Sequence, residues 1–284
     1  MFLTRLISRL PLGVLYRIAD LLFFIGFYLI RYRRTLVSRN LRNAFPDRSN
    51  EELNKIEKKF YRNLCDYAVE MLKLLTITKE ELSRRVIFTN PEVAKKYLDN
   101  NQSVLYLASH QFNWEWLLVT GCLVYPGAMD FVYQSVNSKF FDTLSMECRT
   151  RFGAFPIKRN EVAREAVRRK NILRGTAIVA DQYPGYGRDR KFSTVFLNQE
   201  TVFFYGANQI AILTQSPAVY HKIKKTQRGY YEVTLIELGK PPYAKDSNEV
   251  IENYVRETER VIVENPAEWL WSHNRWKTRH LKTA

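Results

Sequence analysis

A histidine and a glutamate lie five positions apart in the stretch YLASHQFNWEWLL, residues 106–118. On one continuous helix, five steps of about 100° would leave His110 and Glu115 out of contact. If His110 instead ends a strand and a helix begins near Asn113, a residue type that favours helix N-termini, the turn could return the carboxylate to the imidazole. A carboxylate on one ring nitrogen fixes the tautomer and leaves the other nitrogen free to accept a proton. The pair is therefore a candidate general base for activating a hydroxyl.

The spacing His-x-x-x-x-Glu also has a structural interpretation, in which His110 is a hydrogen-bonded histidine at a strand end. A metal site is disfavoured because the four histidines form no His-Glu-x-x-His pattern. No Gly-x-Ser-x-Gly elbow and no P-loop occur, which argues against a serine hydrolase and a nucleoside triphosphatase. The three cysteines are odd in number and widely spaced, which argues against a disulfide framework or zinc knuckle and for a reducing cytosol.

Short apolar runs alternate with helical patterns, which indicates an α/β fold with a largely parallel central sheet flanked by helices. In such sheets ligand sites gather beyond the carboxyl ends of the strands, and His110 and Asp181 each follow a predicted strand. A long helix is also predicted from Ser49, a capping residue that precedes two glutamates and an apolar stripe. The predicted strands are 103–108, 129–133, 176–180, 216–221 and 230–236, and the predicted helices are 113–122, 139–151, 161–173, 205–214 and 248–265.

The formal net charge of +15 indicates an acidic partner, which could be nucleic acid, an anionic membrane surface or a phosphorylated substrate. The first fifty residues carry nine arginines against Asp20 and Asp47, and the arginines flank an apolar segment, which favours the membrane surface. No helix-turn-helix, RNP or zinc-finger pattern is present, so we expect no nucleic-acid partner. The 14% aromatic content indicates that the protein also binds something apolar.

The N-terminal apolar segment begins at Pro11, and its uninterrupted part, residues 21–30, is half of the roughly 20 residues that a spanning helix needs. Arginines follow it between positions 31 and 42, as expected for a helix that lies in, or dips into, an anionic cytoplasmic leaflet. The alternatives are a fully spanning helix and a core helix of the globular domain. We predict a membrane-anchoring segment at 1–45 and a single large domain at 46–284.

Five blocks carry a recognisable pattern in a fixed order: SRNLRNAFPDRSNEE from Ser38, SHQFNWEW from Ser109, KRNEVAREAVRRKNILRG from Lys158, ADQYPG from Ala180 and EWLWSHNRWKTR from Glu268. Together they resemble the motifs of the late acyltransferases of lipid A biosynthesis, the lauroyl/myristoyl acyltransferase family. SHQFNWEW is similar to the histidine-glutamate box of that family, HX4E. The last block is the most specific, because tryptophans, a histidine and a basic cluster would rarely occur in that order by chance.

The resemblance implies transfer of a fatty acyl group from acyl carrier protein to a hydroxyl of the lipid A precursor, an acylated, phosphorylated glucosamine disaccharide lipid, at the cytoplasmic face of the inner membrane. It implies a glycerolipid acyltransferase-like fold, with residues 46–284 as the acyltransferase domain. No metal is required, and no cofactor beyond acyl carrier protein as donor. By carry-over, His110 would be the general base and Glu115 would orient it. The implied substrate-binding residues are Arg159, for the oxyanion or a phosphate, Asp181, Arg149, Arg151, Arg275 and Lys277.

Two groups of basic residues keep alternative interpretations. Arg275 and Lys277, with the neighbouring tryptophans, could bind a phosphate at the membrane interface or could belong to a terminal strand or turn that closes the domain. The basic residues of the block from Lys158 could dock the acidic acyl carrier protein or could form a solvated helix face; they are Arg164, Arg168, Arg169 and Lys170.

Two positions depart from the family pattern: Gln134 stands where the family often has arginine, and Asn198 where it often has the glycine of Phe-Phe-Gly. They leave the acceptor and the acyl-chain length open. The alternatives are an acyltransferase for another glycolipid, aminolipid or lysophospholipid, and a non-catalytic membrane protein that binds anionic lipid. Lysophosphatidate acyltransferases usually have Asp in place of Glu115 and a downstream Phe-Pro-Glu-Gly-Thr block, which is absent here.

Overall fold

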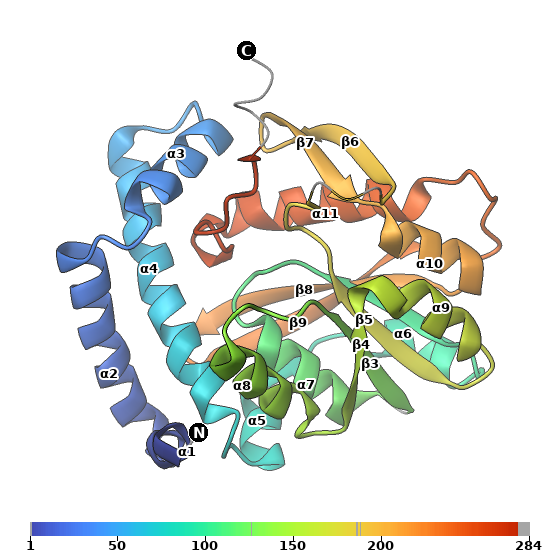
Figure 1. The fold of residues 1–284 in the computed structure, drawn as a ribbon, viewed down its shortest axis with the longest axis horizontal. Helices are drawn as coiled ribbons and strands as arrows, with labels where there is room; N and C mark the ends of the chain where they lie inside the picture. The colour runs from blue at the N-terminus through green and yellow to red at the C-terminus, as the bar shows by residue number, and fades with distance from the viewer. Residues whose placement is uncertain (1, 126, 186, 188, 278–284) are drawn as a thin grey trace.

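A seven-stranded sheet forms the centre of the protein (Figure 1). The computed structural model describes residues 2–277 apart from 126, 186 and 188. The strand order is β1-β9-β8-β2-β5-β3-β4, and all neighbours are parallel except β8 and β9, so the predicted largely parallel sheet is confirmed. The strands, including the separate β6–β7 hairpin, are β1 (Val86–Phe88), β2 (Val104–Ala108), β3 (Ala128–Tyr133), β4 (Ala154–Lys158), β5 (Arg174–Val179), β6 (Lys191–Phe196), β7 (Gln199–Phe204), β8 (Ala218–Gln227) and β9 (Tyr230–Gly239).

Helices cover both faces of the sheet, as expected for α/β proteins. The five predicted strands correspond to β2, β3, β5, β8 and β9, whereas β1, β4 and the hairpin were not predicted. The helices are α1 (Phe2–Ser8), α2 (Leu12–Phe24) with its π-helical continuation η1 (Ile25–Leu29), α3 (Arg34–Ala44), α4 (Asn50–Lys73), α5 (Lys79–Arg85), α6 (Glu92–Leu98), α7 (Trp114–Val124), α8 (Lys139–Thr150), η2 (Arg159–Glu161), α9 (Val162–Arg168), α10 (Gly206–Thr214), α11 (Glu249–Glu264) and η3 (Pro266–Glu268).

The two faces of the sheet have separate cores because successive strand residues point to opposite sides. In β2, Leu105 and Leu107 pack with residues of α10 and α11, whereas Val104, Tyr106 and Ala108 pack with residues of α7. We call these two sides of the sheet the α10 face and the α7 face. All five residues of β2 are buried, as expected for a central strand of a parallel sheet.

The predicted long helix is α4, and its start is confirmed by a capping box. The Ser49 hydroxyl accepts from the backbone N–H of Glu52 at 3.2 Å, and the Glu52 carboxylate accepts from the N–H of Ser49 at 2.9 Å. These bonds satisfy donors that a helix start otherwise leaves open.

Helix α2 packs along α4 with one side (Figure 1). On its other side it exposes apolar residues such as Leu21 and Phe24. Leu15 and Ala19 are fully buried, and the Tyr16 hydroxyl donates to Glu70 at 2.9 Å. Residues Leu12–Leu29 form a stretch of 18 residues that is long and apolar enough to cross a membrane, and 28% of it is buried. The segment is a candidate membrane anchor, and the predicted domain boundary at residue 45 stays a prediction.

Candidate active site

His110 and Asp181 meet at the carboxyl edge of the sheet because their strands are neighbours. Strands β2 and β5 are parallel and in register up to the pair Ala108 and Val179, and each functional side chain follows two residues later. The His110 Nδ1 lies 2.6 Å from Asp181 Oδ1, and the His110 backbone N–H donates to Asp181 Oδ2 at 3.0 Å. A carboxylate at Nδ1 selects the tautomer in which Nδ1 carries the hydrogen, so Nε2 is left to accept a proton.

Asp181 is fully buried and is held as a carboxylate by its neighbours. The Trp269 indole N–H donates to Asp181 Oδ2 at 2.6 Å, so this oxygen receives two donors while Oδ1 receives the imidazole. Burial acts to raise the pKa of Asp181, but the charge of His110 and the hydrogen bonds from His110 and Trp269 outweigh it and hold the pKa below its ordinary value. Asp181 is therefore ionised at neutral pH.

The C-terminal segment lies against the histidine box and fixes its backbone. The Leu270 N–H donates to the His110 carbonyl at 3.1 Å, and the Phe112 N–H donates to the Glu268 carbonyl at 3.0 Å. The sequence placed Trp269 in the C-terminal block but gave it no role. Its position next to Asp181 is set by this backbone pairing, which only the fold reveals.

The predicted contact between Glu115 and His110 is wrong. Glu115 instead forms a bidentate ion pair with Arg149 of α8. The Arg149 Nε and Nη2 lie 2.8 and 2.6 Å from the two carboxylate oxygens. The Trp114 indole N–H also donates to Glu115, at 3.0 Å. No hydrogen bond joins Glu115 to His110 in the part of the chain that the structure describes. Burial acts to raise the pKa of Glu115, but Arg149 outweighs it, so the pKa is lowered and the carboxylate is ionised.

The local geometry explains why Glu115 turns away. The helix begins after Asn113, as predicted, and the Asn113 side chain accepts the N–H groups of both Glu115 and Trp116 at 3.1 Å. The Asn113 amide in turn donates to the buried Glu70 at 2.8 Å. This cap holds Glu115 in the first turn of α7, where a negative charge is favoured by the helix dipole.

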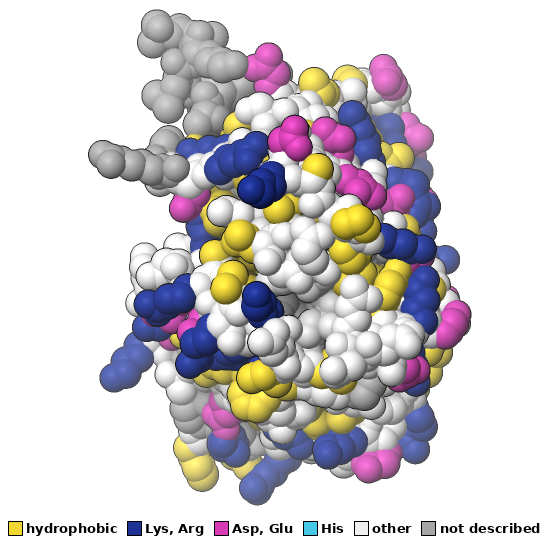
Figure 2. Space-filling model, turned by 90° about the vertical axis from the view of Figure 1, so that its right-hand side faces the viewer, with side chains coloured by type: hydrophobic (Ala, Val, Ile, Leu, Met, Phe, Trp, Pro, Cys, Tyr) yellow, Lys and Arg dark blue, Asp and Glu magenta, His cyan; other side chains and the backbone are white. Residues whose placement is uncertain are grey.

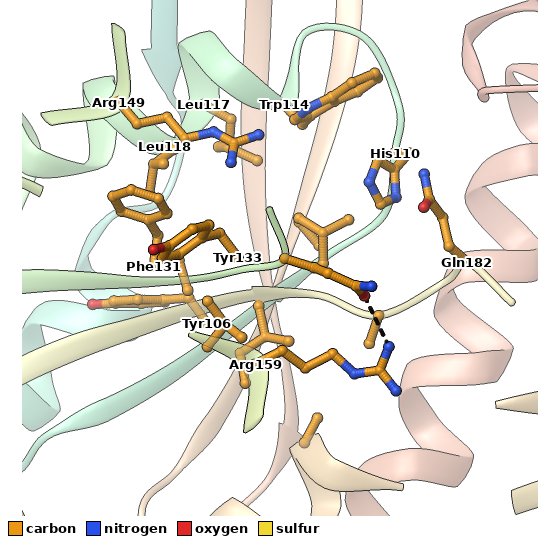
Figure 3. A pocket seen from close by; sticks show the side chains of 18 of the residues that line it. Tyr106, His110, Trp114, Leu117, Leu118, Phe131, Tyr133, Arg149, Arg159 and Gln182 are labelled. Carbon is orange, nitrogen blue, oxygen red and sulfur yellow. Dashed lines mark hydrogen bonds between the residues drawn. The ribbon is translucent and has the colours of Figure 1, made fainter. Parts of the chain in front are cut away.

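A cavity of about 400 Å³ opens beside His110 (Figure 3). This volume lies within the range of roughly 300–1,000 Å³ that is usual for small-molecule sites. Its wall is mostly apolar and includes side chains such as Leu117, Leu118 and Phe131, with Arg149 and Arg159 among the charged residues. An apolar ligand with a polar reacting end fits such a site.

Arg159 lies at the cavity where the sequence expected it, and Gln134 is its partner. The Arg159 guanidinium donates to Gln134 Oε1 at 3.0 Å, the dashed line in Figure 3. The guanidinium donates to the Pro184 carbonyl as well, at 2.9 Å. It also lies 4.5 Å from the centre of the Phe204 ring and pairs with Asp189 at 3.1 Å. The glutamine that departs from the family pattern therefore holds the predicted substrate-binding arginine.

Of the other arginines predicted to bind substrate, one lies at the cavity and two lie away from it. Arg149 lines the cavity, whereas Arg151 donates to the Leu74 carbonyl at 2.8 Å, just beyond the end of α4. Arg275 is buried, donates to the Val202 carbonyl at 2.5 Å and lies over the Phe203 ring. Neither Arg151 nor Arg275 is among the described residues that line the cavity.

Lys277 and His273 belong to the same C-terminal segment. Lys277 is exposed, with its ammonium 5.9 Å from the centre of the Tyr183 ring. The His273 Nε2 accepts the Tyr183 N–H at 3.2 Å, and burial lowers the pKa of His273 to about 4, so it stays neutral. The segment closes the domain over the Asp181 loop, which agrees with one of the two interpretations left open for Arg275 and Lys277.

Comparisons with known proteins point to one family. The model of the family described as bacterial lipid A biosynthesis acyltransferase matches residues 1–278. The match covers all the site residues described above. A comparison with curated proteins finds no match.

Proposed function

Because the chain belongs to the family of bacterial lipid A biosynthesis acyltransferases, we propose that it transfers a fatty acyl group from acyl carrier protein to a hydroxyl of an acylated, phosphorylated glucosamine disaccharide lipid. The observation that carries the proposal is the pair of a partly exposed His110 and a buried Asp181 at the mouth of an apolar cavity. A hydroxyl placed at His110 Nε2 and a thioester with its chain in the cavity would bring the two reacting groups together.

The proposed reaction uses His110 twice. The imidazole Nε2 takes the proton of the acceptor hydroxyl while the oxygen forms a bond to the thioester carbonyl carbon. The tetrahedral oxyanion then collapses, the carbon–sulfur bond breaks, and the imidazolium returns its proton to the leaving thiolate. Asp181 stabilises the imidazolium between these steps through Nδ1. The cycle needs no covalent enzyme intermediate and no cofactor beyond the acyl carrier protein.

Glu115 and Arg149 brace the cavity wall in this mechanism. Their pair is buried on the carboxylate side, with 2% of the Glu115 side chain and 24% of the Arg149 side chain exposed. The charges largely cancel, so the pair can lie beside a hydrocarbon chain without a net buried charge. The pair lies next to Trp114, whose indole donates to Glu115 and lies 5.1 Å from the His110 ring, so the pair reaches the base through this ring and through its charge, without a hydrogen bond to it.

Arg159 is the candidate for the anionic part of the substrate. Its guanidinium lies at the cavity, held by Gln134 and the Pro184 carbonyl, and its planar fork of N–H donors suits a phosphate or an oxyanion. A phosphate or the reaction's oxyanion would exchange for its exposed partner Asp189, whose side chain is 53% exposed. Donors aimed at developing negative charge are a large part of acyl-transfer catalysis.

The membrane and acyl carrier protein are further proposed partners. The apolar stretch Leu12–Leu29 and the arginines after it suit an anionic leaflet, with the active site on its cytoplasmic side. Two of these arginines have protein partners, since Arg33 donates to the Ser272 carbonyl and Arg34 pairs with Glu57. Figure 2 shows the side of the protein away from helices α2 and α3, where Lys and Arg side chains lie among hydrophobic side chains and among Asp and Glu. Its basic residues could contact an acidic protein.

Of the basic residues considered for docking acyl carrier protein, the α9 group is partly paired within the protein. Arg169 pairs with Asp130 and Glu165, and Arg168 pairs with Glu165. Arg164 and Lys170 are exposed. We therefore place the docking proposal on Arg164 and Lys170.

Mass spectrometry of the reaction tests the proposed function. The assay contains the purified protein, acyl carrier protein loaded with mixed acyl chains, and a tetra-acylated lipid A precursor. The wild type should add one acyl group, and His110→Ala should lower turnover by about a hundred- to ten-thousand-fold with the fold intact. Arg256→Ala, on the exposed side of α11, is the control and should react as the wild type. No mass gain from folded wild-type protein with any chain length would contradict the proposal.

A further inference from the structure

The cavity beside His110 extends along both faces of the sheet. Four successive residues of the β5 region, Ala177, Ile178, Val179 and Ala180, all line it. Ala177 and Val179 pack with the core of the α7 face, whereas Ile178 and Ala180 belong to the core of the α10 face. Since alternate strand residues point to opposite sides, one cavity reaches both sides of β5.

The passage between the faces lies where two neighbouring strands part. The ladder between β3 and β5 ends at the pair Phe131 and Ala177. Beyond it, β3 continues to pair with β4 as far as Tyr133, and β5 continues to pair with β2 as far as Val179. The carboxyl ends of β3 and β5 are therefore separated by an unpaired gap, and the cavity-lining residues Val132 and Ile178 border it.

The arm on the α7 face ends at the side chains of Tyr106 and Met129. Its wall includes Leu117, Leu118 and Gly121 of α7, and its floor includes Met129 and Tyr106. A Cβ added at Gly121 would meet the Met129 methyl at 3.5 Å, so this glycine leaves space at the floor. The arm is apolar enough to hold a hydrocarbon chain.

The other arm of the same cavity lies on the α10 face and begins near Arg159. Val162, Ala207 and Ile210 line it, together with Phe204, over whose ring the Arg159 guanidinium lies. An apolar groove with a cation at its entrance matches a fatty chain attached to an anionic head group.

We propose that the α10-face arm binds a fatty chain that the acceptor lipid already carries, while the α7-face arm binds the chain that is transferred. The inference rests on the proposed function and goes beyond it by assigning the two chains to opposite faces of the sheet. His110 lies at the mouth shared by both arms, so the acceptor hydroxyl and the thioester carbonyl meet there. The acceptor's phosphate lies at Arg159, on the α10 side of that mouth.

Two small-to-large variants separate the arms and serve as controls for each other. Gly121→Leu fills the α7-face arm, and Ala207→Leu fills the α10-face arm. The readouts are the preferred donor chain, from acyl carrier protein with mixed chains, and the ratio of kcat/KM for a tetra-acylated acceptor to that for the same disaccharide with fewer chains. Val162→Phe is the second α10-face variant if Ala207→Leu fails to fold.

The wild type should favour the tetra-acylated acceptor by roughly tenfold or more, since apolar groups in a fitted pocket give discrimination of that size. Ala207→Leu should lower this acceptor ratio most of the way to one and should keep the donor-chain preference of the wild type. Gly121→Leu should shift the donor preference to shorter chains and keep the acceptor ratio. An Ala207→Leu enzyme with changed donor preference and an unchanged acceptor ratio would overturn the assignment. A folded wild-type protein that transfers no acyl group would overturn the proposed function and therefore the assignment as well. This outcome differs from the previous one, in which acyl transfer occurs but the arms are assigned wrongly.

Discussion

Asp181 and Glu115 are two buried carboxylates near His110, and they differ in the partner that each one has. Asp181 accepts the His110 imidazole and the Trp269 indole. Glu115, five residues from His110 in the chain, accepts the Arg149 guanidinium instead. The lowered pKa of each keeps both ionised, so charge state does not distinguish them. The two carboxylates are distinguished by their partners. A carboxylate bonded to an imidazole supports proton transfer, whereas a carboxylate bonded to a guanidinium supports the structure.

The difference shows that distance along the chain is a poor guide to contact in a parallel sheet. His110 and Asp181 are 71 residues apart, yet their strands pair residue for residue up to Ala108 and Val179. Parallel neighbours bring their carboxyl ends to the same edge, and ligand sites form there. Glu115 is kept from His110 by the start of α7, which the Asn113 cap fixes.

The largest expected effect is on catalysis, from Asp181→Asn. An amide would donate to His110 Nδ1 and leave the hydrogen on Nε2, which could then no longer accept a proton. By analogy with the aspartate of serine-protease triads, kcat should fall by about 10⁴. Glu115→Gln keeps the His110–Asp181 pair and should retain far more activity when both are assayed at equal folded concentration. A Glu115→Gln enzyme as inactive as Asp181→Asn would reverse the assignment.

The next effect is on stability, from breaking the Glu115–Arg149 pair. Removing one partner of a buried ion pair typically costs about 3–5 kcal/mol, because the other charge is left buried. We discount this toward the lower end because part of the Arg149 side chain is exposed. Glu115→Gln should therefore lower the free energy of unfolding in urea by about 2–3 kcal/mol. The double variant Glu115→Leu with Arg149→Met should recover most of it, and a double variant less stable than either single one would contradict a bracing role.

A third buried carboxyl group, Glu268, sharpens the contrast because it keeps its proton up to about pH 7. Glu268 accepts the Lys225 backbone N–H at 3.2 Å, and burial raises its pKa to about 7. The folded protein therefore holds a proton between about pH 4.5 and 7 that the unfolded chain has lost, so stability contributed by Glu268 falls as pH rises through that window. Glu268→Gln removes this loss and should be more stable than the wild type by up to about 3 kcal/mol at pH 8, with no difference near pH 4.5. Equal stability profiles from pH 4.5 to 8 would show that Glu268 is ionised throughout.

The smallest effect is expected from Trp269→Phe, which removes one donor from Asp181 and keeps an aromatic ring beside Trp271. A hydrogen bond to a charged group is worth about 1.5–3 kcal/mol, so kcat should fall by roughly 10- to 100-fold with KM unchanged. The acid limb of the kcat/KM profile should move to higher pH, because the lost indole donor no longer helps to lower the pKa of Asp181. Trp276→Phe is the matched control, since its indole donates to Thr201 Oγ1 at 2.8 Å in the same cluster. Equal kinetic losses in the two variants would reduce Trp269 to a packing residue.

Most of the fold follows from the sequence because its elements are strongly patterned. Central strands such as β2 are continuous apolar runs, and α4 carries its start signal at Ser49. Strand β4 escaped prediction because it is a short edge strand that contains Pro156 and buries only Ala154 and Ile157. The β6–β7 hairpin escaped because its pairing depends on contacts with the C-terminal segment, such as the bond from Trp276 to Thr201.

The sequence predicted which residues lie at the site better than it predicted which of them contact one another. His110, Asp181, Arg149 and Arg159 all lie at the cavity or its edge, and strand ends were the signal that identified the first two. Which carboxylate meets His110 could not be predicted, since it depends on strand order. Arg151 resembles a site residue in sequence but points to the carbonyls at the end of α4, because α8 ends beside that helix.

A mutant cycle on kcat tests most directly whether His110 and Asp181 act as one unit. Residues that act together in catalysis are strongly non-additive. Combining Asp181→Asn with His110→Ala should give about the same kcat as His110→Ala alone, whereas adding Glu115→Gln to His110→Ala should lower kcat by its own independent factor. The opposite pattern, with Glu115 non-additive and Asp181 independent, would contradict the pairing that the structure shows.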